Sequence, residues 1–450
     1  MKPFKEFIKE LNYKIGIPLP ESWAALNEVQ IAQRFLEKLN EYFFQTYEGI
    51  GTTTFNNEEL QYFSEFHEFW EIHHKEILNV KIDEVQVELA AQALSQATRK
   101  YGVKIFKVTR NTFGLPPQAI AKVRFFTANQ DFREPPENQF EKYFEDNNKF
   151  DAEEINEDPE SFLMFLGVTR LSQTDKRRDF AYNAAQFLLE KDISAYDIAT
   201  YFDNDAIQIR EALVKAPNMG YGYKKANMFI RDMFELGVWQ TLENFDKIDV
   251  ASDINTMKLA LRTRILQTEI PLLSSFLDEF CYQYGYLDEM SASAWRTVWE
   301  KWKHSDPKTA PPSPCKMDFL LYRIGREYCK DMTVQYTCEN GHIFYHFGTQ
   351  LKICPICRRE GTRTTVRVIK KELPCQVNSD NLPRVHGNLL LKDDNLLTCF
   401  DGVCIFEKVC KPKNEKFCAF NPPKSISIKG KTSWTNSYAY RERGGGGMMG

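Results

Sequence analysis

The chain has 450 residues, is 43% hydrophobic and 27% charged, and carries a formal net charge of −4. That composition is ordinary for a globular protein, and this length usually means roughly two to four domains. The slight negative charge argues against nonspecific coating of nucleic acid, although it allows a local basic face. No stretch approaches the ~20 apolar residues of a membrane span. The N-terminus carries acidic residues and lacks a long apolar core, unlike a secretory signal. We therefore expect a monomeric, cytoplasmic protein.

Residues 1–130 form the first predicted region, which is helical with a small β element. Apolar residues recur at spacings of three and four over Val29–Phe44 and Val85–Ala97, which predicts helices. Residues 101–126 instead hold two β-branched and aromatic runs separated by G-L-P-P. This pattern predicts a small β-hairpin-like element. Its lysines and arginines leave two interpretations open, a face that contacts nucleic acid or a solvated strand face.

Residues 131–157 are acidic and lack an apolar period, so we expect an exposed linker there. The helical pattern resumes at Ser161 and defines a helical core over residues 158–330. Within this core Leu171–Asp175 reads L-S-Q-T-D and joins an apolar helix to a second one. A helix-capping turn explains that string by itself. The basic residues Lys176 and Arg177 follow it and are candidates for phosphate contact.

The most informative stretch runs from Pro217 to Arg262 and reads as a helix, a tight turn and a second helix. Gly220 and Gly222 allow the backbone of the turn to take positive φ and to approach a ligand closely. Backbone amides of a glycine-rich turn that opens a helix suit a phosphate group. Lys224 and Lys225 come directly afterwards. Taken singly, such a lysine is as readily explained as a solvated side chain.

The string G-Y-G-Y-K-K-A-N resembles the hairpin of the helix-hairpin-helix DNA glycosylases, the superfamily of endonuclease III, adenine glycosylase and 8-oxoguanine glycosylase. In its lyase-competent members the hairpin lysine is the nucleophile, a role that falls on Lys224. The family also has an Asp-containing motif downstream, which D-I-N-T-M-K-L-A-L-R matches from Asp253 to Arg262. Asp253 could equally be a plain helix N-cap. The L-S-Q-T-D string resembles the family's opening segment, where Gln173 would fill the gap left by an extruded base.

This resemblance covers about residues 158–330 and implies a glycosylase that acts on double-stranded DNA in the nucleoid. The target base would be flipped out of the duplex, and Asp253 would stabilise the positive charge that develops on the sugar. Lys224 would form a Schiff base that permits strand cleavage. Lys225 replaces the usual Thr or Val, which leaves open which lysine faces the pocket. The additional domains suggest an unusual target, such as a hypermodified base of phage DNA. The alternative is a non-catalytic DNA-binding protein.

The eleven cysteines are concentrated in the C-terminal third, since none precedes Cys281 and ten lie from Cys315 onward. In a reducing compartment such clustering favours metal binding over disulfides. Gly325, Arg326 and Cys329 resemble the family segment whose cysteine is the first ligand of a [4Fe–4S] cluster. The spacing of the following cysteines departs from that of the family.

Residues 331–375 contain C-E-N-G-H followed by C-P-I-C and resemble a zinc ribbon or treble-clef knuckle. The two pairs predict a closed tetrahedral Zn²⁺ site formed by Cys338, His342, Cys354 and Cys357. An iron–sulfur cluster would instead recruit Cys329 and omit His342. Residues 376–450 form a last region, whose end we expect to be disordered. A second metal site and free thiols are both open for its cysteines, which are Cys399, Cys404, Cys410 and Cys418.

Overall fold

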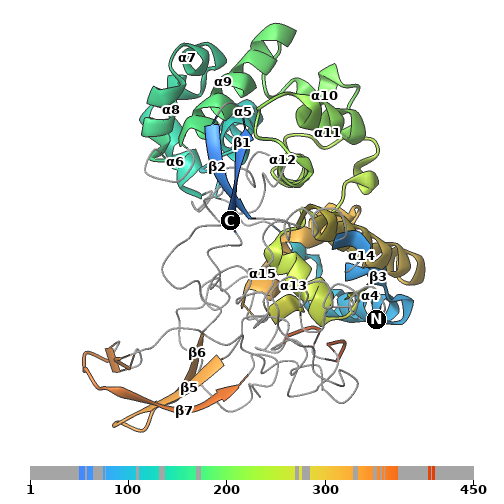
Figure 1. The fold of residues 1–450 in the computed structure, drawn as a ribbon, viewed down its shortest axis with the longest axis vertical. Coiled ribbons are helices and arrows are strands. Elements are labelled where there is room, and N and C mark those ends of the chain that lie inside the picture. Colours follow the sequence, from blue (N-terminus) through green and yellow to red (C-terminus); the bar gives the residue numbers. More distant parts are fainter. Residues whose placement is uncertain are drawn as a thin grey trace. The chain divides into compact units, whose positions relative to one another are not determined.

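The computed structural model describes residues 50–55, 58–63, 74–76, 78–107, 111–130, 137–168, 174–268, 273–275, 284–327, 333–347, 352–354, 357–358, 360–372, 404–406 and 408–410. This part of the chain is mainly helical, as the sequence predicts. It divides into two compact units (Figure 1). Unit 1 draws on Met1–Ile105, Ser252–Thr309 and Leu320–Met448, and unit 2 is formed chiefly by Phe106–Ala251 and Ala310–Phe319.

Unit 2 is built from helices around an aromatic core. Helices α7 and α8 pack along α9, and α5 packs against α12. Its helices are α5 (Pro117–Ala128), α6 (Glu137–Glu145), α7 (Ala152–Glu157), α8 (Pro159–Leu166), α9 (Thr174–Lys191), α10 (Ile198–Tyr201), α11 (Ala206–Lys215) and α12 (Tyr223–Glu235). Two of them start at an aspartate whose side chain caps the backbone, Asp158 before α8 and Asp205 before α11.

The β-hairpin-like element expected over residues 101–126 is wrong. Val103–Phe106 is a short 3-10 helix, and Pro117 opens the regular helix α5. Nearly every residue of α5 from Ala119 onward is buried, including Arg124. A helix that is buried all round has no polar stripe, so its β-branched and aromatic residues form a continuous run that resembles a strand.

Residues 131–157 also differ from the expected linker. From Glu137 onward they form α6, a short 3-10 turn and α7. Phe140, Phe150 and Ile155 are fully buried in the core of unit 2. The acidic residues occupy the outer faces of short helices. Because charged residues dominate the sequence here, the few apolar positions that anchor the segment show no recognisable period.

A chain of buried charges lies inside unit 2. The Arg124 guanidinium donates to Asp232 at 2.8 Å, and both side chains have no exposed surface. Asp232 also pairs with Arg231 at 2.8 Å, and Arg231 in turn pairs with Asp318. Two arginines and two aspartates thus neutralise one another, as buried charges require.

Unit 1 contains a second helical core, in which α4 packs against α14 and α14 against α13. Trp295 and Trp302 of α14 are fully buried in this core. Asp83 caps α4, as its carboxylate accepts hydrogen bonds from the amides of Val85 and Gln86. The helices are α4 (Glu84–Tyr101), α13 (Ile254–Arg262), α14 (Tyr284–Ser305) and α15 (Asp318–Glu327), the last belonging to this unit from Leu320 onward.

Three small antiparallel sheets complete the described part of unit 1. Strands β1 (Ile50–Phe55) and β2 (Glu58–Phe63) pair as a hairpin, and β3 (Lys81–Ile82) pairs with β4 (Leu266–Gln267). The N-terminal region thus contains a β element, but at residues 50–63 rather than 101–126. The third sheet has the order β6-β5-β7. Its strands are β5 (Thr333–Cys338), β6 (Ile343–Phe347) and β7 (Val366–Glu372). Across the described ranges, every helix falls short of the length or hydropathy that crossing a membrane requires.

Candidate functional site

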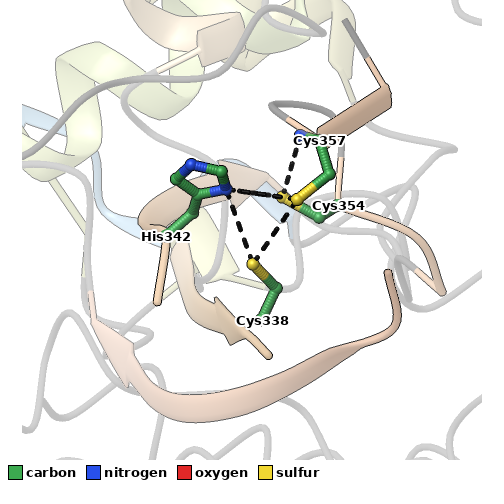
Figure 2. Close-up of side chains that lie close together, drawn as sticks. All are labelled: Cys338, His342, Cys354 and Cys357. Atoms are coloured by element: carbon green, nitrogen blue, oxygen red, sulfur yellow. Dashed lines mark hydrogen bonds between the residues drawn. The ribbon is translucent and has the colours of Figure 1, made fainter. Parts of the chain in front are cut away.

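Four predicted metal ligands converge beside the β5–β7 sheet. Cys338 ends β5, and His342 follows a tight turn in which Gly341 adopts a φ of 77°. Cys354 and Cys357 lie on a second knuckle just before β7. That knuckle is fixed by bonds from the Cys354 amide to the Thr364 carbonyl at 2.9 Å and from the Thr362 amide to the Cys357 carbonyl at 2.8 Å. Figure 2 shows the four side chains pointing toward one another.

The distances between these ligand atoms fit one tetrahedral ion. Zn–S bonds of ~2.3 Å and Zn–N bonds of ~2.0 Å place two sulfurs ~3.8 Å apart and a sulfur and a nitrogen ~3.5 Å apart. The Cys338 and Cys357 sulfurs are 3.8 Å apart, and His342 Nδ1 lies 3.6 Å from Cys338 Sγ and 3.8 Å from Cys354 Sγ. All four ligand atoms lie within 4.8 Å of one another. The cluster can therefore hold a metal ion.

The electrostatics of the cluster favour thiolates, the form that binds metal. The Thr364 hydroxyl beside the Cys357 sulfur, together with Cys354 and His342, lowers the pKa of Cys357 to about 6. Hydrogen bonding to Cys357 raises the pKa of His342 above its usual value. Asn340 Nδ2 also donates to Cys357 Sγ at 3.3 Å, a contact that would orient the sulfur as a ligand. Binding of a metal would release the proton from the imidazole nitrogen.

The helix, turn and helix predicted around Pro217 are confirmed, with α11 leading into the turn and α12 following it. Gly220 adopts a φ of 74°, and a Cβ there would lie 2.7 Å from the Phe180 ring, so only glycine fits. Gly222 differs from the prediction, because its backbone is extended (φ −90°, ψ 176°). It is the N-cap of α12, and no side chain caps that helix end.

Side chains from neighbouring helices hold this turn in place. Asn129, just after α5, donates from Nδ2 to the carbonyls of Phe180 and Met219 at 3.2 and 3.1 Å. The Tyr221 hydroxyl donates to the Phe125 carbonyl at 2.7 Å. Sequence reasoning missed Asn129 and Phe180, and no local pattern marks either residue.

The two lysines after the turn have different surroundings. The Lys225 ammonium donates to the Asn129 carbonyl at 2.6 Å and lies 5.7 Å from the centroid of the Phe180 ring. Lys224 is half-buried on the first turn of α12, and among the described residues its ammonium has no hydrogen-bond or ion-pair partner. Lys225 therefore braces the turn, whereas the Lys224 ammonium is unpaired among the described residues.

Asp253 is the N-cap of α13, the structural role that the sequence also allows. Its Oδ1 accepts hydrogen bonds from the amides of Asn255 and Thr256, both at 2.9 Å. Its Oδ2 accepts from Asn255 Nδ2 at 3.0 Å. The Thr256 hydroxyl accepts in return from the Asp253 amide at 2.7 Å, which completes a capping box. The half-buried carboxylate is thus held in a fixed orientation by its own helix turn.

The Gly-Arg string at Gly325 and the Asp253 motif, which resemble two different segments of the glycosylase family, lie in contact at the start of α13. Gly325 of α15 lies against the first turn of α13, where a Cβ would fall 2.2 Å from the Asn255 carbonyl oxygen. Only a glycine lets the two backbones approach so closely. Gly325 was singled out as part of the Gly-Arg string before Cys329, and its contact with the Asp253 turn could not be read from the sequence.

The remaining predicted site residues divide into three groups. Arg177 is buried and its guanidinium donates to the Gln130 carbonyl at 2.9 Å, so its assignment as a phosphate contact is wrong. Lys176 is half-buried at the start of α9. The others lie outside the described residues, namely Gln173, Cys329, Cys399 and Cys418.

The C-terminal cysteines that the structure describes lie in a turn of unit 1. Cys404 is buried and Cys410 half-buried, and Phe406 between them contacts the Trp295 ring. Within the described ranges, the set of Cys338, His342, Cys354 and Cys357 is the one cluster that could hold a metal. Searches for relatives gave no match, either among protein-family models or among curated proteins.

Proposed function

We propose that this protein is a DNA glycosylase of the helix-hairpin-helix class that flips a damaged or modified base out of duplex DNA and cleaves its N-glycosidic bond. The observation that carries the proposal is the availability of Lys224. The turn before it requires glycine at position 220, α12 begins without a side-chain cap, and the neighbouring Lys225 is engaged by Asn129. This geometry presents a lysine amine beside backbone amides that suit a phosphate.

The proposed chemistry assigns one role to each residue. Asp253, fixed by its capping box, stabilises the positive charge that develops on the sugar as the bond from C1′ to the base breaks. The neutral amine of Lys224 attacks C1′, the base leaves with its bonding electrons, and loss of a proton from nitrogen gives an aminal. The sugar ring then opens: the nitrogen lone pair forms the C=N bond of the Schiff base, and O4′ leaves C1′ and takes up a proton. β-Elimination from that Schiff base breaks the bond to the 3′ phosphate. Without Lys224, water takes its place and the product is an abasic site.

We further propose that the Cys338 cluster binds Zn²⁺ as a structural site. Four protein ligands leave no open position for catalysis. An iron–sulfur cluster would omit His342, whose Nδ1 lies 3.2 Å from Cys357 Sγ and within 3.8 Å of the other two sulfurs. The convergence of the imidazole with the thiols therefore favours zinc.

Base release and covalent trapping test the proposal. Duplexes carrying ordinary oxidative lesions and phage DNAs with hypermodified bases are screened for free base. Asp253→Asn should abolish release while it keeps the fold, because asparagine caps a helix as well as aspartate does. Lys224→Ala should remove the borohydride-trapped protein–DNA adduct, and Lys225→Ala should retain it. Release of base at the wild-type rate by Asp253→Asn would contradict the assigned carboxylate.

A second function is favoured by the contacts of Asp253. Both of its oxygens are satisfied within its own helix turn, as in a purely structural cap. The protein would then bind DNA through the hairpin and the metal module without cleaving it. DNA affinity combined with no base release from any substrate in the screen would support this function.

A further inference from the structure

The metal-binding module carries charge of the opposite sign to the whole chain. We define it as residues 333–372, with the sheet β6-β5-β7 and the two knuckles that hold the metal ligands. It contains seven basic and three acidic residues, a net charge of +4, whereas the complete chain carries −4. The rest of the protein therefore carries a net charge of −8, and the basic charge of the module is a local feature.

The described basic side chains of the module are exposed and have no counter-ion. They are Lys352, Arg358, Arg363 and Arg367, and none forms an ion pair within the described residues. The two acidic side chains that the structure describes, by contrast, contact the module itself. Glu339 accepts a hydrogen bond from the Thr365 hydroxyl at 3.2 Å, and Glu360 lies 3.8 Å from His342 Nε2.

Three basic side chains of unit 2 are instead neutralised by carboxylates. Lys122 pairs with Asp151 and Lys149 with Glu154, and Lys316 lies 2.6 Å from Glu235. Unpaired cations that lie close together on a surface repel one another, and an anionic partner would neutralise this repulsion. In the described part of the module, four such cations fall within residues 352–367.

The four basic residues are also held together by the second knuckle. Lys352 lies across from β7, where its carbonyl accepts from the Val366 amide at 3.3 Å, next to Arg367. Arg358 follows the ligand Cys357. Arg363 lies between Thr362 and Thr364, both of which are bonded to ligand cysteines. Because the metal ligands fix this loop, the spacing of the charges is set by the metal site.

We propose that this basic face, defined as Lys352, Arg358, Arg363 and Arg367, binds the phosphate backbone of duplex DNA, as a second contact in addition to the hairpin. It deepens the proposed function, on which the choice of DNA as partner rests. Phosphate contacts add affinity without reading sequence. A second contact would hold the protein on DNA while the hairpin and Lys224 engage the target nucleotide.

Salt-dependent binding of the full-length, metal-loaded protein tests this proposal. The probe is a fluorescein-labelled duplex without modified bases, and the variant combines Arg358→Gln, Arg363→Gln and Arg367→Gln. Each phosphate contact contributes ~0.9 to the slope of log affinity against log salt, so loss of three lowers the slope by ~2.7. Between about 0.05 and 0.2 M salt, affinity for the variant should fall ~40-fold less than for the wild type.

A matched control removes three exposed lysines outside the module, through Lys107→Gln, Lys247→Gln and Lys308→Gln. Retained metal shows that the knuckle of the module variant is intact. An equal decrease of the salt-dependence slope in both variants would mean that only net charge matters. An unchanged slope in the module variant would mean that the basic face contacts another anion, such as a lipid vesicle or an acidic protein. Either result overturns the proposal. The assay needs no base release, so it stands apart from the test of glycosylase activity.

Discussion

Replacement of Gly325 by alanine probes the contact between α15 and the helix turn that carries Asp253. The added Cβ would lie 2.2 Å from the Asn255 carbonyl oxygen and 2.6 Å from its carbonyl carbon, whereas real Cβ atoms essentially never come within 3.0 Å. Both partners are backbone, so a helix must shift by about 1 Å. Overpacking of this kind costs ~1–3 kcal/mol, and the better helix propensity of alanine returns up to ~1 kcal/mol. We expect a net loss of about 1–2 kcal/mol.

The same shift should reduce activity more than it reduces binding. Displacement of a reacting group by about 1 Å can cost ~100-fold in rate. We therefore expect single-turnover base release by Gly325→Ala to fall by that order, with little change in affinity for the duplex, because the hairpin of unit 2 is untouched. Denaturant unfolding measures the stability of the variant, and rapid-quench assays measure its rate.

Gly285→Ala is the matched control for this experiment. Gly285 also lies in a helix of unit 1, but a Cβ there meets nothing within 4 Å. The substitution should be neutral or stabilise the protein by up to ~1 kcal/mol. If Gly325→Ala were as stable and as active as Gly285→Ala, the close approach of α15 to α13 would contribute nothing to stability or to the orientation of Asp253, which would refute the prediction.

Three further predictions concern the metal, a buried charge and pH. Cys357→Ser should abolish binding of one zinc ion per chain and the amide-exchange protection of β5–β7, and Cys410→Ser, outside the cluster, should keep both. Asp232→Asn should lower the free energy of unfolding by about 3–5 kcal/mol, because it leaves Arg124 without its buried partner; a loss below about 1 kcal/mol would contradict this. The Ser95 and Thr309 hydroxyls and Arg99 lower the pKa of Asp306 to about 2. The stability that this carboxylate contributes is complete above its ordinary pKa of about 4 and is lost as pH falls from about 4 to about 2. Unfolding curves of Asp306→Asn should lack this part of the acid dependence.

The sequence predicts correctly those features whose determining residues lie close together along the chain. Cys338, His342, Cys354 and Cys357 were identified because two close pairs of ligands suffice to define a tetrahedral site. The hairpin was identified because its turn needs glycine and its helices have clear apolar periods. In both cases the determining residues lie within a few positions of one another along the chain.

The failures concern features that depend on tertiary surroundings. Helix α5 was predicted wrongly because it is buried on nearly every side, so its sequence lacks the polar stripe that marks a surface helix. Arg177 was assigned to phosphate because a charged residue in a basic run is ordinarily solvated, whereas Gln130 holds it inside unit 2. The contact of Gly325 with Asn255 joins residues 70 positions apart, and no pattern within one helix encodes it.

The conformation of the hairpin turn depends on Asn129, a residue outside the hairpin. Its side-chain amide secures the carbonyls of Phe180 and Met219, and its own carbonyl receives Lys225. One residue at the end of α5 thus joins three segments that are distant in sequence. An attempt to transplant the hairpin alone onto another scaffold would leave behind the amide that sets its shape. A redesign that changes the position of Lys224 should therefore treat α5, α9 and the turn as one structural unit.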